Sequence, residues 1–491
     1  MKTHFRKSLI TSSAIGLFLL TFFIQKCNTK DPVEQKIQQL AVDGFDCKVY
    51  QGLSDFVITN KNERSFRKYF NTSGELDTSR LNMSINKIIG AGLFTPSSCF
   101  NTIQHINTVN IFLENSGSMD GYVRGITDYE AALADLVVEI QHHYGEDNLS
   151  IYFVNTDVYP VKMDSNISDF FSSLEPKKGP YVIGNQSVSE LNEIFRMIVE
   201  RTGKNDISIF ISDCIYSLDK NRSTLRGLVF QQSLTKSVFL DKSKEFSLSA
   251  FVLQMTSNFD GNYYDKDNKV SVLKNVTRPY YIWIMGEDGI VREFLKKKDL
   301  TKYTGFKNSY FFSSNSNVGL NAEVLGRTQT VGRFSIDRKD KSILQDINPS
   351  NNSFQFSLAV DFSDYPDQKS VVNKTSFAIT PGFEIVNIQP IPNNNQPKLL
   401  DANDWNIVAN KGYSHLVTVR SLDPMFQPDF SLTFTNTLPI WVESSNIDDD
   451  SNILQSLNQT FGLKYLFAGV QSAYETNGIS TPQFKLTLNK K

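Results

Sequence analysis

The chain has 491 residues, a length that predicts two or three domains. Its 50 Lys and Arg residues nearly balance 52 Asp and Glu residues, so bulk charge gives no support to a nucleic-acid partner. Hydrophobic residues make up 40% of the chain, which is enough to build sizeable cores.

Residues 1–27 have the layout of an export signal: a basic start, a mostly apolar run over residues 8–24, and then Cys27. Cys27 resembles the lipid-modified Cys of a bacterial lipoprotein, although Lys26 stands where a small residue is expected. An uncleaved membrane anchor and simple secretion are the alternatives. All three place the bulk of the chain outside the cytoplasm. The first two predict a protein anchored to a membrane of the cell envelope through its N-terminus.

Residues 28–105 are interpreted as an N-terminal extension packed on the next domain, with a small separate cap as the alternative. Within them, residues 46–50 look strand-like and residues 82–89 favour a helix. Cys47 and Cys99 are placed to pair in an oxidising compartment, although sequence does not prove the pairing.

Residues 106–300 alternate between apolar strand-like runs and helical periodicity. This pattern predicts an α/β fold with a doubly wound, mostly parallel sheet and helices on both faces. Residues 260–268 are predicted to be a polar loop, and Ser187 with Glu190 matches the capping box that starts a helix. The predicted strands are 109–113, 149–154, 159–161, 207–211, 248–256 and 280–286, and the predicted helices are 128–142, 187–201, 224–239 and 288–298.

Residues 303–491 change rhythm to short alternating runs separated by Asn, Asp, Gly and Pro. This pattern favours an all-β, sandwich-like C-terminal domain. One helix is expected within it, over residues 463–475.

The first strand of the α/β region ends in an acid and two hydroxyls, Glu114, Ser116 and Ser118. In open α/β sheets, ligands bind at the carboxyl ends of strands. Three hard oxygen groups on one short loop suit Mg²⁺, Mn²⁺ or Ca²⁺. The alternative interpretation is that these side chains only cap the following segment.

This order of elements, with the loop around Ser116 and Ser118, resembles the von Willebrand factor type A domain. That family builds a metal-ion-dependent adhesion site from a DxSxS loop, a distant Thr and a distant Asp. Ser116 and Ser118 match the two serines, and Asp213, after the third buried strand, matches the distant Asp. The chain departs from the family at Glu114, where an Asp is expected.

The distant Thr has no obvious counterpart. Ser187 is the candidate, with Ser189 and Thr127 as weaker alternatives. The resemblance implies a divalent metal held by a set of five residues, and a protein partner that completes the coordination without catalysis. The predicted set is Glu114, Ser116, Ser118, Ser187 and Asp213.

Two other functions stay open. Asp120, Asp128 and Asp157 lie where they would line the same edge, as in metal-dependent hydrolases. A structural subunit of a cell-envelope assembly, with a degenerate metal site, is the third hypothesis. Cys214 is interpreted as a small buried hydrophobe, and no residue is predicted to be catalytic.

Overall fold

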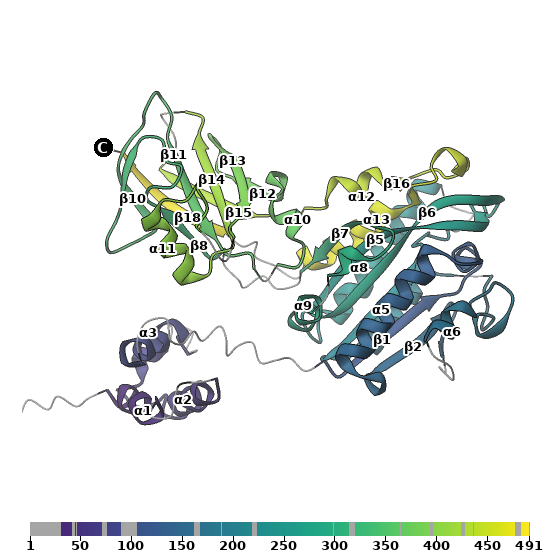
Figure 1. Cartoon of the computed structure of the whole chain (residues 1–491), viewed down its shortest axis with the longest axis horizontal. Helices are drawn as coiled ribbons and strands as arrows, with labels where there is room; N and C mark the ends of the chain where they lie inside the picture. Colours follow the sequence, from purple (N-terminus) through teal and green to yellow (C-terminus); the bar gives the residue numbers. More distant parts are fainter. Residues whose placement is uncertain are drawn as a thin grey trace, which may run out of the picture. The chain divides into compact units, whose positions relative to one another are not determined.

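The computed structural model divides the chain into two compact units, Met1–Thr102 and Ile103–Lys491 (Figure 1). Cys27 and Cys99 lie outside the described residues, so lipidation and the pairing of Cys47 with Cys99 stay predictions. In the part of the chain that is described, no helix is long and apolar enough to span a bilayer. The described residues are 31–41, 45, 47–70, 76–89, 106–161, 167–187, 189–218, 223–297, 299–313, 320–363, 365–392, 396–423, 428–435, 437–476 and 483–490.

The described residues of the first unit include three α-helices around a small apolar core: α1 (Pro32–Leu40), α2 (Cys47–Thr59) and α3 (Thr78–Ile89). The predicted strand over residues 46–50 is wrong, because α2 begins there. Tyr50, Leu53 and Val57 recur at helical spacing and are all buried in the core. The predicted helix over residues 82–89 is confirmed as part of α3.

The second unit is built on a seven-stranded sheet in the order β3-β2-β1-β4-β6-β5-β7. β1 pairs in parallel with β2 and with β4, and the other neighbouring pairs are antiparallel. The predicted α/β class is confirmed, with a parallel centre. The strands are β1 (Thr108–Glu114), β2 (Leu149–Val154), β3 (Val158–Pro160), β4 (Asp206–Ser212), β5 (Leu248–Tyr264), β6 (Val270–Glu287) and β7 (Phe306–Phe312).

The strands β5 and β6 form one long antiparallel hairpin, whereas the sequence predicted separate parallel strands and a loop over residues 260–268. Only a few residues connect the two strands, and a parallel pair needs a much longer crossover. Phe259, Gly261 and Tyr263 are buried in alternation with their more exposed neighbours, which is the period of a strand. The polar residues between these buried positions are the reason why the sequence predicted a loop.

Helices cover both faces of the sheet, as predicted. α5 (Asp128–Tyr144), α6 (Ile167–Ser172) and α9 (Asp288–Lys296) share one core, and α7 (Leu191–Arg201) and α8 (Thr224–Lys242) share the other. Alternate residues of each central strand point into opposite cores: Ile111 lies in the core with α5, and Phe112 lies in the core with α7.

The capping box is not at the predicted position. The N-cap residue of α7 is Glu190, and it makes no side-chain cap bond, so the predicted box at Ser187 is wrong. The capping box lies at the start of α5, between Thr127 and Glu130. A Ser or Thr three residues before a Glu is common, and only the chain path decides which pair begins a helix.

After β7 the chain forms two further sheets that share one apolar core. One has the order β12-β15-β18-β10-β9 and the other β13-β14-β11-β8, and all pairs except β10 with β18 are antiparallel. The elements are β8 (Ala322–Leu325), β9 (Arg333–Ile336), β10 (Ile343–Asn348), β11 (Gln355–Val360), α10 (Gln368–Val371), β12 (Phe377–Ile379), β13 (Phe383–Pro390), α11 (Ala402–Lys411), β14 (His415–Ser421), β15 (Asp429–Phe434) and β18 (Gln483–Lys490).

Between β15 and β18 the chain returns to the central sheet. This return segment contains α12 (Ile440–Ser444), β16 (Asn446–Ile447), β17 (Thr460–Phe461) and α13 (Leu463–Thr476). Helix α13, expected from the sequence, packs beside α8, and Phe467 lies against Trp283 of β6. The β-rich range 303–491 therefore also supplies a helix to the core of the central sheet.

Candidate metal site at the edge of the sheet

The carboxyl ends of β1 and β4 meet at one edge, because the two strands are parallel neighbours. Glu114 is the last residue of β1, and Asp213 directly follows β4. The register pairs Leu113 with Ile211, so both acidic residues lie at the same end of the sheet. The structure thus brings these two predicted site residues together.

The loop after β1 is held by a pair of buried amides. Asn115 is fully buried, and its side-chain amide donates to the carbonyls of Tyr181 (2.9 Å) and Ile183 (3.0 Å). Asn155, which follows β2, donates to the side-chain oxygen of Asn115 at 2.9 Å. Sequence reasoning missed both residues, because an Asn among hydroxyl residues reads as an ordinary turn residue. Side chains from two neighbouring strand ends therefore fix the loop.

Gly117 lies between two other segments that border the loop. Its N–H donates to the Gln186 carbonyl at 2.9 Å. A Cβ atom at this position would meet the Tyr264 ring and hydroxyl at 3.5 Å. The turn before α7 and the β5–β6 hairpin therefore both border the loop, and neither contact was predicted.

Hydroxyl groups accompany both carboxyl groups. Ser116 and Ser118 bring their hydroxyl oxygens to 3.0 Å from each other. The Ser189 hydroxyl donates to Glu114 Oε1 at 2.6 Å. Glu114, Ser116 and Asp213 are each at most 4% exposed. The arrangement concentrates oxygen ligands in a place that excludes most water.

Burial and a neighbouring negative charge act on Asp213. Its burial, followed by repulsion from Glu114, raises the pKa of Asp213 to about 7. A hydrogen bond from Ser118, the Ile215 backbone N–H and the Arg278 charge act in the opposite direction. Two buried carboxylates close to each other repel, and a bound cation relieves this repulsion.

Arg278 is a buried cation that the sequence did not reveal. It is 1% exposed, and its guanidinium lies 4.8 Å from the centre of the Tyr263 ring. It donates to the carbonyls of Leu457 (2.8 Å) and Gln459 (2.9 Å) in the return segment. These are contacts between residues far apart in the chain, which no local pattern predicts.

Ser187 is not among the side chains that gather at this edge. It is exposed, and its N–H donates to the Asn185 side chain at 3.1 Å. Ser189, the weaker alternative, makes the contact with Glu114. Thr127, the other alternative, is occupied as the N-cap of α5.

Cys214 follows Asp213 in a left-handed backbone conformation, with φ of 55°. Its thiol is fully buried, and burial raises the pKa of the thiol well above the ordinary value. A thiol in this state is protonated and a poor nucleophile. The interpretation of Cys214 as a buried hydrophobe fits these observations.

The remaining acidic residues do not build a larger cluster. Asp120 is partly buried, and burial raises its pKa, while Asp128 is exposed. Asp157 is also exposed and caps its own backbone by accepting from Val158 N–H at 2.7 Å. Among the residues described, no group of three or more His, Cys, Asp or Glu side chains is arranged to hold a metal.

In comparisons with known proteins, no protein family, curated protein or solved structure matches the chain. The site therefore has to be judged by its own chemistry. Two carboxyl groups and three hydroxyls form a hard-oxygen donor set that fits Mg²⁺, Mn²⁺ or Ca²⁺. Because only two of these groups are carboxyls, water or an acid from a partner would have to complete the coordination.

Proposed function

We propose that the chain is an exported, membrane-tethered binding protein of the von Willebrand factor type A kind. Its α/β sheet would engage a protein partner through a divalent metal ion held at Glu114, Ser116, Ser118 and Asp213. One observation carries this proposal: two buried carboxyl groups and a hydroxyl pair 3.0 Å apart meet at one edge of the sheet.

Electrostatics supports a cation at this edge. A buried carboxylate is costly unless it is paired, and Glu114 and Asp213 repel each other. Arg278 offsets only part of this repulsion, since burial and Glu114 still leave the pKa of Asp213 at about 7. A divalent ion would hold both groups in the charged form.

Glu114 is one methylene longer than the Asp that the DxSxS loop has at this position, and we propose a less direct role for it. It accepts a hydrogen bond from Ser189 at 2.6 Å, so one of its oxygens is already engaged. Glu114 would then act through Ser189 or through water, and the serines and Asp213 would be the closer ligands. Ser189 would take the place in the site that the sequence predicted for Ser187.

The metal part of the proposal is tested by titrating the full chain with Mn²⁺ in a calorimeter. We expect saturable binding that weakens at least tenfold in Ser118→Ala. Ser233→Ala is the matched control, because Ser233 is exposed on α8 and its hydroxyl donates to the Val229 carbonyl of the same helix. No binding by the wild type, or equal weakening in the control, would refute a metal site here.

The same preparation separates the alternative functions. Metal-dependent turnover of a phosphoester or peptide substrate, lost in Asp213→Ala, would favour a hydrolase. Detergent-phase partitioning of wild type against Cys27→Ser tests the lipid anchor. Equal partitioning of the two would leave an uncleaved apolar segment as the tether.

A further inference from the structure

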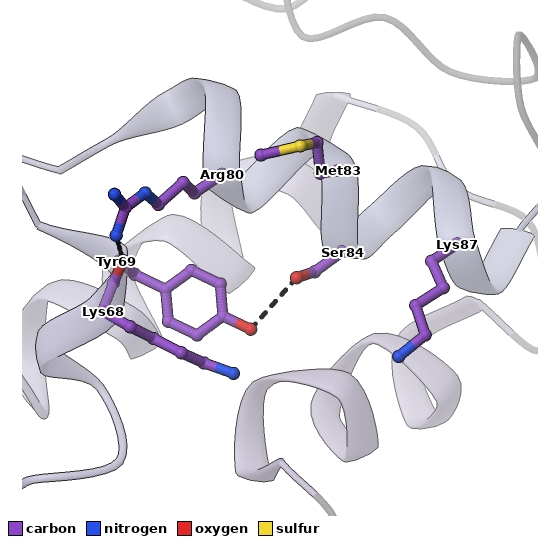
Figure 2. Close-up of a pocket in the computed structure, with 6 residues that line it drawn as sticks. All are labelled: Lys68, Tyr69, Arg80, Met83, Ser84 and Lys87. Carbon is purple, nitrogen blue, oxygen red and sulfur yellow. Dashed lines mark hydrogen bonds between the residues drawn. The ribbon is translucent and has the colours of Figure 1, made fainter. Parts of the chain in front are cut away.

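The N-terminal unit carries a pocket whose polar lining consists of hydrogen-bond donors. The pocket has a volume of about 250 Å³. Its lining residues come from α3 and from the short 3-10 helix η2 (Arg67–Tyr69), and Figure 2 shows them around the Tyr69 ring. They are Lys68, Tyr69, Arg80, Met83, Ser84 and Lys87.

The charged side chains that line this pocket are cations, and two hydroxyl groups lie between them. Lys68, Arg80 and Lys87 have side chains that are 56%, 57% and 67% exposed. The hydroxyls of Tyr69 and Ser84 lie 3.1 Å apart, as the dashed line in Figure 2 marks. Among the residues that the structure describes, no carboxylate lines this pocket.

The acidic partners of these cations stand outside the lining. Lys68 pairs with Asp31, Arg80 Nε lies 3.1 Å from Asp77, and Lys87 Nζ lies 2.8 Å from Glu34. The basic side chains of these pairs are exposed, and such ion pairs contribute little free energy. The Asp31 side chain is only 11% exposed, so a ligand displaces Asp77 and Glu34 more easily than Asp31. Because each of these cations has an acidic partner, the pocket does not carry an unbalanced positive charge.

Asp31 indicates what kind of group accepts hydrogen bonds from these donors. The Tyr69 hydroxyl donates to Asp31 Oδ2 at 2.6 Å, and Lys68 donates to the same oxygen. An oxyanion is thus already bound by an ammonium and a phenol at the rim. A phosphate has more oxygens than a carboxylate and would offer additional acceptors to the donors that line the pocket.

We infer that this pocket binds a phosphate group, and that the phosphate is that of an anionic lipid headgroup. The inference rests on the proposed membrane attachment. Asp31 follows Cys27 by four residues, which span about 14 Å at full extension, so an anchor at Cys27 keeps α1 near the bilayer. Met83, which is 64% exposed, offers an apolar contact beside the cations. Basic side chains near an anionic membrane surface are attracted to it.

The test uses the full chain in a neutral detergent and calorimetric titration with three probes. These are dihexanoylphosphatidylglycerol, dihexanoylphosphatidylcholine and inorganic phosphate. We expect the phosphatidylglycerol to bind most tightly, and its affinity to fall at least tenfold in Arg80→Gln/Lys87→Gln. Equally tight binding of inorganic phosphate, lost in the same variant, would overturn the lipid assignment.

The matched control is Arg64→Gln/Arg67→Gln, which removes the same charge from exposed positions of the same unit outside the pocket. Equal loss in both double variants, or no binding by the wild type, would overturn the pocket. Lys87→Arg keeps the charge and is expected to retain binding, which guards against a folding defect. The short-chain lipid needs no anchor and no metal, so this result is independent of Cys27 and of Ser118.

Discussion

At the scale of single residues, buried polar side chains define both the candidate site and the stability of the fold. Asn115 and Asn155 fix the loop that presents the serines, while Glu114 and Asp213 supply its charge. These groups are costly to bury without partners, and each has at least one. Substitution at such positions should therefore have large and specific effects.

Asp404 is a buried carboxylate held by the backbone of the loop after β8. It accepts from the N–H groups of Gly326, Arg327 and Thr328 at 2.7–3.1 Å and also from the Thr328 hydroxyl. We expect Asp404→Ala to lower the free energy of unfolding by about 2–3 kcal/mol, because it leaves the buried N–H and hydroxyl of Thr328 without this acceptor.

Urea denaturation monitored by tryptophan fluorescence measures the effect of Asp404→Ala, since Trp405 is adjacent. Asp401→Ala on the same helix is the control. It removes only an N-cap bond to Asn403 N–H, worth about 1 kcal/mol. Equal losses in the two variants would contradict the account of Asp404.

Glu130 predicts a pH dependence of stability. Burial, followed by repulsion from Glu175, raises its pKa from 4.5 to about 7 against the Thr127 cap bond. The folded state therefore binds its proton more tightly than the unfolded state. Stability is lost as pH rises from about 4.5 to about 7.

Glu130→Gln removes this titration and keeps a side chain that suits the capping box. We expect the variant to gain stability relative to wild type between pH 5 and pH 8 in urea denaturation. An unchanged difference across that range would show that Glu130 does not titrate as stated.

At the scale of elements, helix α13 of the return segment packs against α8, which covers one face of the central sheet. Gly469 of α13 faces the Gln232 carbonyl, and a Cβ atom there would lie 2.6 Å from that oxygen. It would also lie 2.7 Å from Thr235 Cβ. Neither group is the flexible end of a long side chain, so the helix would have to shift.

We therefore expect Gly469→Ala to destabilise the second unit by about 2 kcal/mol, within the range for overpacked cores. Gly52→Ala in α2 is the opposite case, since no atom lies within 4 Å of the new Cβ. There the gain in helix propensity should stabilise the first unit by up to about 1 kcal/mol. Thermal unfolding followed by circular dichroism measures both, and a loss in both variants would contradict the packing argument.

At the scale of the whole molecule, periodicity predicted the elements better than their assembly. Strands β1, β2 and β4 were predictable because each is a short apolar run with a helical pattern beside it. The β5–β6 hairpin and the return of α13 were not, because they depend on contacts between residues far apart in the chain.

The candidate site divides in the same way. Glu114, Ser116, Ser118 and Asp213 were predictable, since they stand at the ends of two strands. The exchange of Ser187 for Ser189 was not, because the path of the turn before α7 decides which hydroxyl faces Glu114. Arg278 and Tyr264 border the site from a stretch that the sequence suggested was partly a loop.

The central claim is that a divalent ion binds at this sheet edge. The most direct measurement is the anomalous difference density of a crystal soaked in Mn²⁺. We predict a single strong peak between Ser116, Ser118 and Asp213, absent from crystals of Ser118→Ala. A soaked wild-type crystal with no peak at that position would contradict the claim.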